Sequence, residues 1–319
     1  MMRNARAMKV FLLALLPAAP LHAQDGNIIF PIADIETRLR TQPFTIYDMR
    51  GSRFEDDRTQ RVAMEFPDSQ RMLVKWAKAP NRGGNTFNNE PRYEIAAYEF
   101  QKLFLSEREY VVPPTVMRAV DLEYYRTLQP SAGPTFSNTA SVIVVLQYWL
   151  TQVSPRDVHN EKRFDTDSLY ARHFANLNIF SYLVRHSDSN AGNVLISTDS
   201  TNPRVFAVDN GVAFGYESSD RGTAWRNLIV KRVPKSTIER LRKITLDDLH
   251  NALGTVGQYE IRDRQLVAVP HTANTNPGAG VRNRDNVVQF GLTDREIKEM
   301  HRRITSLVTR VDDGKLQTF

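Results

Sequence analysis

Two short polar segments carry the residue types best suited to chemistry. The segment HSDSNAGNVLIS, residues 186–197, places His186, Asp188 and Asn193 in the order H-x-D-x-x-x-x-N. Sixteen residues after Asn193, the segment VFAVDNGVAFG places Asp209 directly after an apolar run and before Asn and Gly. Asn, Asp and Gly are typical of turns and unfavourable inside strands. The pattern therefore predicts two acidic turns beside buried strands, an arrangement that can hold a cation.

Two further charged residues lie earlier in the chain. Lys75 falls within MLVKWA, which has the composition of a strand, and Glu94 falls within EPRYEIAAYEF, which has helical spacing. A strand lysine can hold the phosphates of a nucleotide as a point charge, and a helix glutamate can orient that lysine. Taken alone, Lys75 is explained equally well as a solvated edge residue. Glu94 alone is an ordinary helix residue, and Glu90 or Glu99 takes its place if the phase of the helix differs.

Together these residues fit a phosphoryl-transfer site, where the protein mainly positions reactants and neutralises charge. Asn193 and Asp209 supply hard oxygen ligands for metal ions that bridge phosphates, and Asp188 can accept the proton of an attacking hydroxyl group. His186 has the character of a structural loop histidine hydrogen-bonded to backbone. We predict Asp188 and Lys75 as catalytic residues and Asn193 and Asp209 as metal ligands. The predicted nucleotide-binding residues are Lys75, Glu94, Gln147, Asn193 and Asp209.

The elements that must position these residues change character along the chain. Strand patterns dominate residues 44–150, in TIYDM, RVAMEF, RMLVKWA, YVVPPTVMRAV and SVIVVLQYWL. The last of these is continuously apolar, as expected of a strand covered on both faces. One helix is predicted at residues 90–107, with Pro91 at its start. The last strand leads into a short connection at residues 146–151, where Gln147 is the candidate contact to the nucleotide.

The second half of the chain, residues 151–319, is predicted to be mostly helical. SLYARHFANLNIFSYLVRH places an apolar stripe at helical spacing and runs straight into the first acidic turn. Capping-box spacings predict that two more helices begin at Ser236 and at Thr293. Residues 269–286 are polar and rich in Gly and Pro, which predicts a loop. Two lobes joined by a hinge are the simplest interpretation, with an N-terminal extension at residues 24–43.

The order and spacing of these residues resemble the protein-kinase-like superfamily over most of residues 70–215. EIAAYEF followed by VVPPTV, a D-x-x-x-x-N loop containing GN, and VDNGVAFG are similar to an atypical branch, the Golgi casein kinases of the secretory pathway and their xylose-kinase relatives. HipA-type bacterial kinases and type II phosphatidylinositol 4-kinases share the outline, and HSDSNAGNVL is similar to the HGDxxxxN loop of aminoglycoside and choline phosphotransferases.

This resemblance implies an α+β, two-lobed protein-kinase-like fold with a β-rich N-lobe at residues 44–150 and a mostly helical C-lobe at residues 151–319. It implies ATP as cofactor with Mg²⁺ or Mn²⁺, and the roles given above for Lys75, Glu94, Asp188, Asn193 and Asp209.

The chain departs from ordinary protein kinases in three ways. No G-x-G-x-x-G precedes Lys75, because the loop RGSRFEDDRTQ contains Gly51 alone. Asn210 stands where D-F-G has Phe, so activation by packing of that Phe does not carry over. No A-P-E triplet follows, so a peptide-binding segment of the ordinary type is not expected.

The start of the chain has the pattern of a secretory signal peptide. Arg3, Arg6 and Lys9 precede the short apolar run VFLLALLPAAP, and Ala23 is a small residue to cut after. Removal of residues 1–23 takes away three positive charges and no acids, so the net charge falls from +6 to +3. That value does not favour nucleic acid as a partner. We expect export to a bacterial periplasm or medium, consistent with the absence of cysteine, and no membrane span after signal removal.

The leading hypothesis from the sequence is an exported ATP-dependent kinase that phosphorylates a hydroxyl group of a protein or glycan. A small-molecule or lipid kinase of the same fold is the second hypothesis. The third is a pseudokinase that binds nucleotide or a partner without chemistry, suggested by the missing glycine loop and by the scarcity of ATP outside the cytoplasm. The acceptor, the preferred metal and the oligomeric state stay open at this stage.

Overall fold

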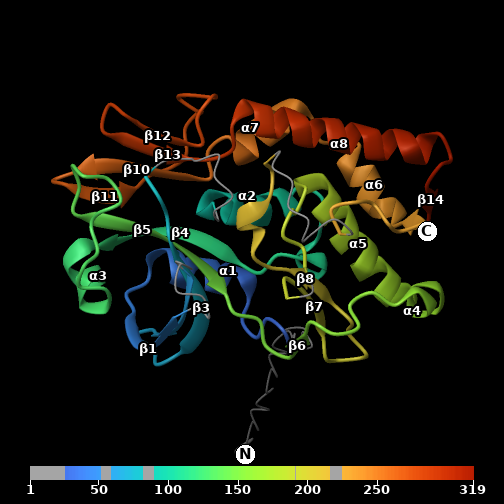
Figure 1. The fold of residues 1–319 in the computed structure, drawn as a ribbon, viewed down its shortest axis with the longest axis horizontal. Helices are drawn as coiled ribbons and strands as arrows, with labels where there is room; N and C mark the ends of the chain where they lie inside the picture. The colour runs from blue at the N-terminus through green and yellow to red at the C-terminus, as the bar shows by residue number, and fades with distance from the viewer. Residues whose placement is uncertain (1–25, 52–58, 82–89, 191, 216–224) are drawn as a thin grey trace, which may run out of the picture.

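The first half of the chain forms an antiparallel sheet. The computed structural model describes residues 26–51, 59–81, 90–190, 192–215 and 225–319; the predicted signal peptide and most of the RGSRFEDDRTQ loop lie outside this part. The strand order is β1-β2-β3-β5-β4 (Figure 1). The strands are β1 (Thr45–Gly51), β2 (Thr59–Glu65), β3 (Arg71–Lys78), β4 (Thr115–Asp121) and β5 (Ser141–Tyr148).

Alternation along the strands gives this sheet two different faces. Val74 and Trp76 of β3 pack with helices α1 and α3 in one apolar core. Because neighbouring side chains of a strand point to opposite faces, Lys75 points to the other side, toward helix α2. The helices of this half are α1 (Ile32–Thr41), α2 (Pro91–Gln101), the 3₁₀ turn η1 (Glu107–Glu109) and α3 (Leu122–Leu128).

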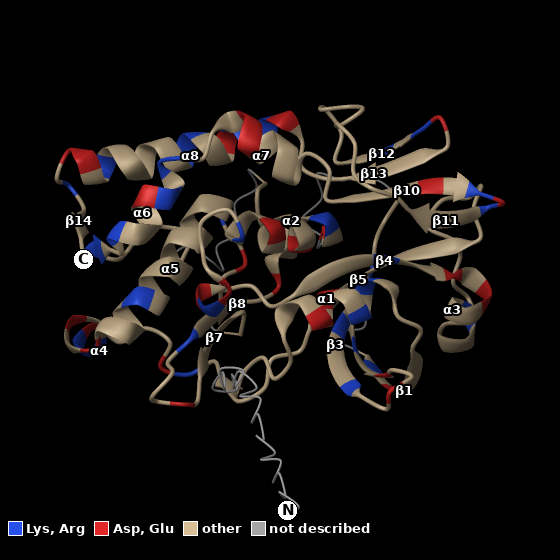
Figure 2. Cartoon of the chain, turned by 180° about the vertical axis from the view of Figure 1, so that it is seen from behind, with Lys and Arg blue, Asp and Glu red and all other residues tan. Residues whose placement is uncertain are grey.

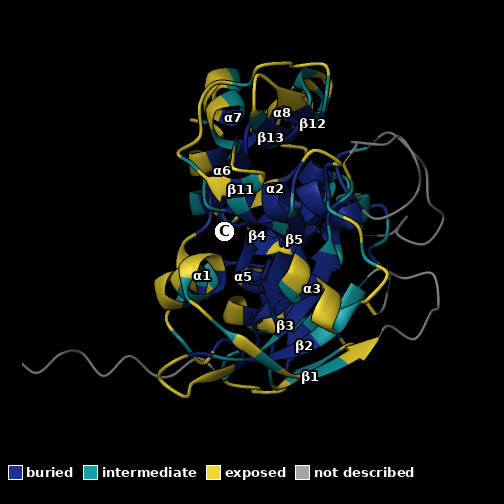
Figure 3. Ribbon diagram, turned by 90° about the vertical axis from the view of Figure 1, so that its left-hand side faces the viewer, coloured by how far each residue is buried: buried dark blue, intermediate teal, exposed yellow. Residues whose placement is uncertain are grey.

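Strand β5 lies inside the sheet, between β3 and β4. All of its residues are buried, as its continuous apolar sequence predicts (Figure 3). Helix α2 begins at Pro91 as predicted but ends at Gln101, six residues before the end expected from the sequence. Residues 102–106 after it turn away from the helix, so Leu103 and Leu105 do not extend its apolar face.

The predicted strand YVVPPTVMRAV is wrong in its first half. The strand β4 begins only at Thr115, because Pro113 and Pro114 have no N–H to give to a sheet ladder. The side chain of Gln101 takes the place of a neighbouring strand. Its Oε1 accepts from the backbone N–H groups of Val111 and Val112 at 2.8 Å each, and its Nε2 donates to the carbonyl of Val112 at 2.8 Å.

Helix α5 (Ser168–Val184) is the centre of the second half. Asp167 caps it by accepting from the N–H groups of Leu169 and Tyr170. The helix is buried on nearly all sides rather than along the single stripe we predicted, because other elements surround it. The remaining elements are α4 (Glu161–Thr166), α6 (Lys235–Leu241), α7 (Leu246–Leu253), α8 (Asp294–Asp312), a sheet of β6 (Val153–Ser154), β7 (Val194–Ser197) and β8 (Val205–Ala207), the turn η2 (Asn210–Val212), and a parallel pair of β9 (Arg232–Val233) and β14 (Gln317–Thr318).

A four-stranded sheet in the second half was not predicted. Its order is β11-β10-β13-β12, and its strands are β10 (Gly257–Arg262), β11 (Gln265–Ala268), β12 (Val281–Arg284) and β13 (Val287–Phe290). The predicted loop at residues 269–286 is therefore wrong at its end, where β12 begins. This sheet lies beside β4 and β5 rather than over the helices (Figure 1). The carbonyl of Arg264 accepts from the N–H of Ala140 at 2.6 Å, which ties the sheet to the first half.

One of the two predicted capping boxes is present. Thr293 caps α8, and Glu296 returns a hydrogen bond to the N–H of Thr293 at 2.7 Å. The box at Ser236 is wrong, since α6 already begins at Lys235 with Pro234 at its N-cap. Pro234 fixes the backbone just ahead of the helix, and this moves Ser236 into the first turn.

The surface carries charges of both signs. In the view of Figure 2, Lys and Arg lie on elements of both halves, with Asp and Glu among them. None of the helices in the described part of the chain has the length and apolar character needed to cross a bilayer.

A buried ionic network joins α2 to the start of α8. The guanidinium of Arg92 donates to both carboxylate oxygens of Glu296 at 2.9 Å and to Glu90 at 3.0 Å. It also donates to the carbonyl of Gly291, and the hydroxyl of Tyr93 bonds to Glu296. The Arg92 side chain is 5% exposed, so this network fixes α2 against the C-terminal helix.

The network makes the stability of the protein sensitive to acid. Burial alone would raise the pKa of Glu296, but its hydrogen bonds and charge interaction with Arg92 outweigh burial and lower that pKa below 4.5. A lowered carboxyl pKa adds stability that is present above the unfolded value and is lost as the pH falls through the folded value. We expect the free energy of unfolding of the wild type to fall more steeply between about pH 6 and pH 3 than that of Glu296→Gln, measured by urea titration. Equal slopes would contradict this.

Candidate active site

Lys75 lies on β3 and forms a buried ion pair with α2. Its Nζ is 2.6 Å from Oε1 of Glu94, and these side chains are 9% and 2% exposed. Oε2 of the same glutamate accepts from the backbone N–H of Asn210 at 3.0 Å. Glu94 therefore links three elements, and the alternatives Glu90 and Glu99 are occupied elsewhere: Glu90 binds Arg92 and Glu99 binds Lys102.

Asp209 meets the same lysine from the other side. Its carboxylate forms an ion pair with Nζ of Lys75. Asp209 has a left-handed backbone, with φ 55° and ψ 49°, directly after β8 and before η2. Asp adopts this conformation more readily than most residues other than Gly. The side chain of Asp209 is 44% exposed, so part of the carboxylate is open to a ligand.

Asp188 and Asn193 lie on the loop between α5 and β7. The Nδ2 group of Asn193 donates to Oδ2 of Asp188 at 3.0 Å and to its carbonyl at 2.7 Å. Asn190 donates to Oδ1 of Asp188 at 3.1 Å. Pairing of β7 with β8 brings Asn193 beside Val208, whose N–H donates to the Asn193 carbonyl at 2.9 Å. The loop is thus joined to the segment that carries Asp209.

His186 has the structural role predicted for it. It is fully buried, and its Nε2 is 3.1 Å from the carbonyl of Val208, so Nε2 carries the proton. Burial lowers the pKa of His186 and keeps the ring neutral, although Glu94, Asp188 and Asp209 all lie near enough to oppose this effect.

The donor set fits a divalent cation. Among the described residues, no three His, Asp or Glu side chains are arranged to hold a metal ion. Asp209 and Asn193 instead offer two kinds of oxygen: a partly exposed carboxylate, and the amide oxygen of Asn193, whose Nδ2 donates to Asp188. Mg²⁺ commonly takes one or two protein carboxylates and completes its shell with phosphate oxygens and water.

The charges of the site support one another. Burial favours the neutral form of Lys75, but the carboxylates of Asp209 and Glu94 outweigh burial and raise its pKa. In turn, the charge of Lys75 lowers the pKa of Asp209 against the effect of burial. Both groups are therefore charged at neutral pH, as binding of phosphate and metal requires.

Gln147 lies beside Lys75, as its assignment to the site requires. The two residues are paired directly across β3 and β5, and Thr115 of β4 follows in the same row. The side-chain nitrogen of Gln147 donates to the hydroxyl of Thr115 at 3.0 Å, and the side chain is buried. Its contact to a nucleotide stays a prediction.

Two residues near this row were missed in the sequence. Arg61 of β2 is paired directly with Lys75, so both side chains lie on the same face of the sheet. The guanidinium of Arg61 lies 5.5 Å from the ring centroid of Trp149, which is 40% exposed just after β5. The exposed tryptophan at the predicted hinge was the available signal. Nothing in the sequence marks Arg61, because charged residues commonly alternate with apolar ones along a strand that has one face in water.

Comparison with known proteins gives structural matches alone. No family model matches the sequence, nor does any curated protein. The structure of a hydra Fam20 protein with sugar matches with a TM-score of 0.52 and 16% identity, covering 88% of each chain. A Golgi casein kinase matches with a TM-score of 0.50 and 15% identity, over 88% of this chain and 75% of that one. A Golgi casein kinase structure with Mn and ADP bound has a TM-score of 0.49.

These similarities show the fold. It is an α+β, two-lobed protein-kinase-like fold, and the solved structures that share it include secretory-pathway kinases of the atypical branch that the motifs resemble. The prediction of fold class from residues 70–215 is confirmed. At about 15% identity, the activity of these proteins does not transfer to this chain.

Proposed function

We propose that this protein is an exported ATP-dependent kinase that transfers the γ-phosphoryl group to a hydroxyl of a protein or glycan acceptor. One observation carries the proposal: Lys75, Glu94, Asp188, Asn193 and Asp209 come from four separate segments and form two bonded groups, which the hydrogen bond from Val208 to the carbonyl of Asn193 joins. An arrangement of charges built to neutralise phosphate has little structural use of its own, since buried ion pairs add little net stability.

The proposed role of each residue follows from the atoms that its contacts leave available to a ligand. Lys75 binds the nucleotide phosphates, held in place by Glu94. Asn193 and Asp209 hold Mg²⁺ or Mn²⁺, which neutralises the phosphate charge when bound. Asp188, positioned by Asn190 and Asn193, accepts the proton of the acceptor hydroxyl. The hydroxyl oxygen forms a bond to the γ-phosphorus, the bond from that phosphorus to the β–γ bridging oxygen breaks, and ADP leaves.

The ion pair between Lys75 and Asp209 implies a rearrangement on binding. Without nucleotide, Lys75 neutralises the carboxylate that the metal needs. With nucleotide, the phosphates give Lys75 a new partner and the metal ion gives Asp209 one. Metal and nucleotide are therefore expected to bind together more tightly than either binds alone.

The nucleotide site is tested by thermal shift. Residues 24–319 with ATP and Mn²⁺ or Mg²⁺ should melt at a higher temperature than without, because a ligand that binds the folded state adds about 2.7 kcal/mol at a hundred times its Kd. Asp209→Asn should lose most of this shift, since Asn keeps the left-handed backbone but not the charge. Asp285→Asn is the matched control, because Asp285 has φ 53° and is highly exposed.

The outcomes separate the candidate functions. A shift that Asp209→Asn abolishes, followed by phosphate transfer to a peptide or glycan, supports the proposed kinase. Transfer to lipids or small alcohols instead would identify the second hypothesis, a small-molecule or lipid kinase. Metal-dependent binding without transfer to any acceptor would identify a pseudokinase. No shift with any nucleotide would overturn the proposed nucleotide site.

A further inference from the structure

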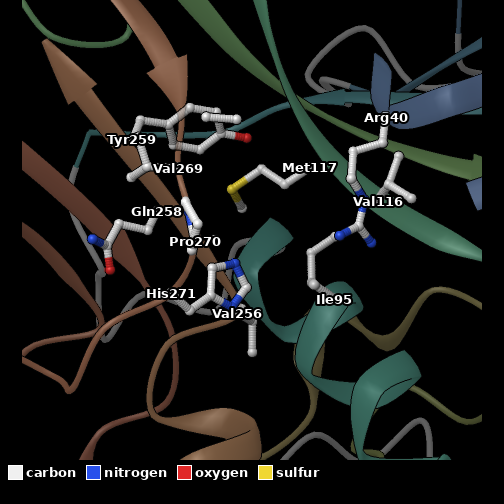
Figure 4. A pocket seen from close by; sticks show the side chains of 12 residues that line it. Arg40, Ile95, Val116, Met117, Val256, Gln258, Tyr259, Val269, Pro270 and His271 are labelled. Carbon is white, nitrogen blue, oxygen red and sulfur yellow. The ribbon is translucent and has the colours of Figure 1, made fainter. Parts of the chain in front are cut away.

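A cavity of about 210 Å³ lies between the two sheets, and none of the residues assigned to phosphoryl transfer lines it. Its walls come from α2, from β4, from β10 and from the segment after β11. Figure 4 shows Arg40 reaching toward it from one side, and Tyr259 and His271 from the other, with Met117 between them.

The walls and the polar groups of this cavity differ in character. Ile95, Val116 and Val256 are buried and give it an apolar lining. Tyr259 is also buried, and no hydrogen bond to its hydroxyl is found within the described residues.

Arginine charges act on the polar groups of the cavity. The charges of Arg40 and Arg118 lie near enough to Tyr259 to oppose the effect of burial on its pKa. Burial and the charge of Arg40 lower the pKa of His271, and the charge of Glu99 opposes them. Arg40 is exposed, and its charge also helps to lower the pKa of Glu36.

The acids that could neutralise Arg40 are already engaged. Glu36 accepts from Lys102 at 2.7 Å and from Tyr98 at 2.6 Å, and Glu99 accepts from Lys102 at 3.1 Å. The exposed guanidinium of Arg40 beside apolar walls offers an anion a charge-assisted hydrogen bond and a place for an apolar group.

We propose that this cavity is a second ligand site, which binds a small organic anion with its carboxylate at Arg40 and its apolar body against Ile95, Val116 and Val256. The volume is below the roughly 300–1,000 Å³ of pockets that hold drug-sized molecules. A ligand the size of an aryl carboxylate fits this limit. Inorganic anions would leave the apolar walls unused.

Met117 provides a local probe for the experiment. Its side chain lines the cavity and its sulfur packs against Gly257, so ¹³C-methyl methionine NMR reports on this site directly. Phenylacetate should shift the Met117 signal, identified by its loss in Met117→Leu, with saturation in the roughly millimolar range expected for a fragment-sized ligand. Phenylacetamide has the same shape without the charge, and should bind at least tenfold more weakly.

Variants separate this site from the nucleotide site. Arg40→Gln should weaken phenylacetate binding at least tenfold with the Met117 signal otherwise in place. Arg284→Gln, at an exposed arginine of β12, and Asp209→Asn should both bind phenylacetate as the wild type does. No Met117 shift, equal binding of phenylacetamide, or undiminished binding by Arg40→Gln would overturn the proposal. If Arg40→Gln fails to fold, the comparison of phenylacetate with phenylacetamide in the wild type still tests the proposal.

Discussion

Asp188→Asn should lower kcat for phosphate transfer by about 10²–10⁴-fold, the range for loss of a general base. The affinity for ATP with metal should stay within about threefold, well below 1 kcal/mol, because Asp188 contacts neither Lys75 nor Asp209 in the site. Asn cannot accept the proton of an acceptor hydroxyl at neutral pH. The measurement is kcat with the acceptor found by screening, together with nucleotide affinity by thermal shift.

Two controls make this result specific. Asn at position 188 presents one N–H₂ group to the donors of Asn190 and Asn193, so the melting temperature must show that the loop stays folded. Asp199→Asn is the matched change, since Asp199 accepts hydrogen bonds from Thr201 on an exposed turn and lies outside the site. A loss of less than tenfold in kcat for Asp188→Asn would contradict its role as proton acceptor.

Arg92→Met should destabilise the protein by about 3–5 kcal/mol, the cost of leaving a buried carboxylate without its partner. Glu296 would lose two hydrogen bonds to the guanidinium while staying largely buried. The free energy of unfolding by urea titration measures this loss. Arg242→Met removes an exposed ion pair with Asp312, so it should cost about 0–1 kcal/mol.

A double variant identifies the source of this cost. Glu296→Gln removes the charge but keeps an oxygen that can still cap α8 at Thr293. Adding it to Arg92→Met should therefore recover part of the lost stability. If the double variant were less stable than Arg92→Met by the full cost of the single glutamate change, the uncompensated charge would not be the cause.

The sequence predicts the fold class correctly, and it singles out the residues of the candidate site by two different kinds of signal. Asp188, Asn193 and Asp209 belong to short polar segments beside apolar runs. Such local patterns can be recognised without knowledge of the tertiary structure. Lys75 and Glu94 were placed by the element each one lies on. Their ion pair depends on α2 packing against β3, which no local pattern specifies.

The sheet of β10–β13 shows what local patterns miss. Each of its hairpins is closed by two residues of positive φ: Asp263 with Arg264, and Asp285 with Asn286. Two-residue turns of this kind favour Asn or Asp followed by Gly, and neither pair contains Gly. Arg264 in particular has no local preference for this conformation, so the first hairpin gave no turn signal.

The surroundings of charged residues whose partners lie far away in the chain could also not be predicted from the sequence. Arg92 reads as an exposed helix residue, yet it is among the most buried cations because its partners are about 200 residues away. Arg40 likewise lies on a helix that was grouped with an N-terminal extension. Tertiary packing, not local propensity, decides the surroundings of both.

The attachment of the last sheet to the first has a consequence for the order of events during synthesis. Ala140 and Ser141 bond to Arg264 and Gln265, so the start of β5 is held by a segment made more than a hundred residues later. Contacts of such long sequence separation form late and slow the folding of a chain. The first half therefore leaves the ribosome before the segment that contacts it has been made. The nascent chain stays incompletely folded during that time.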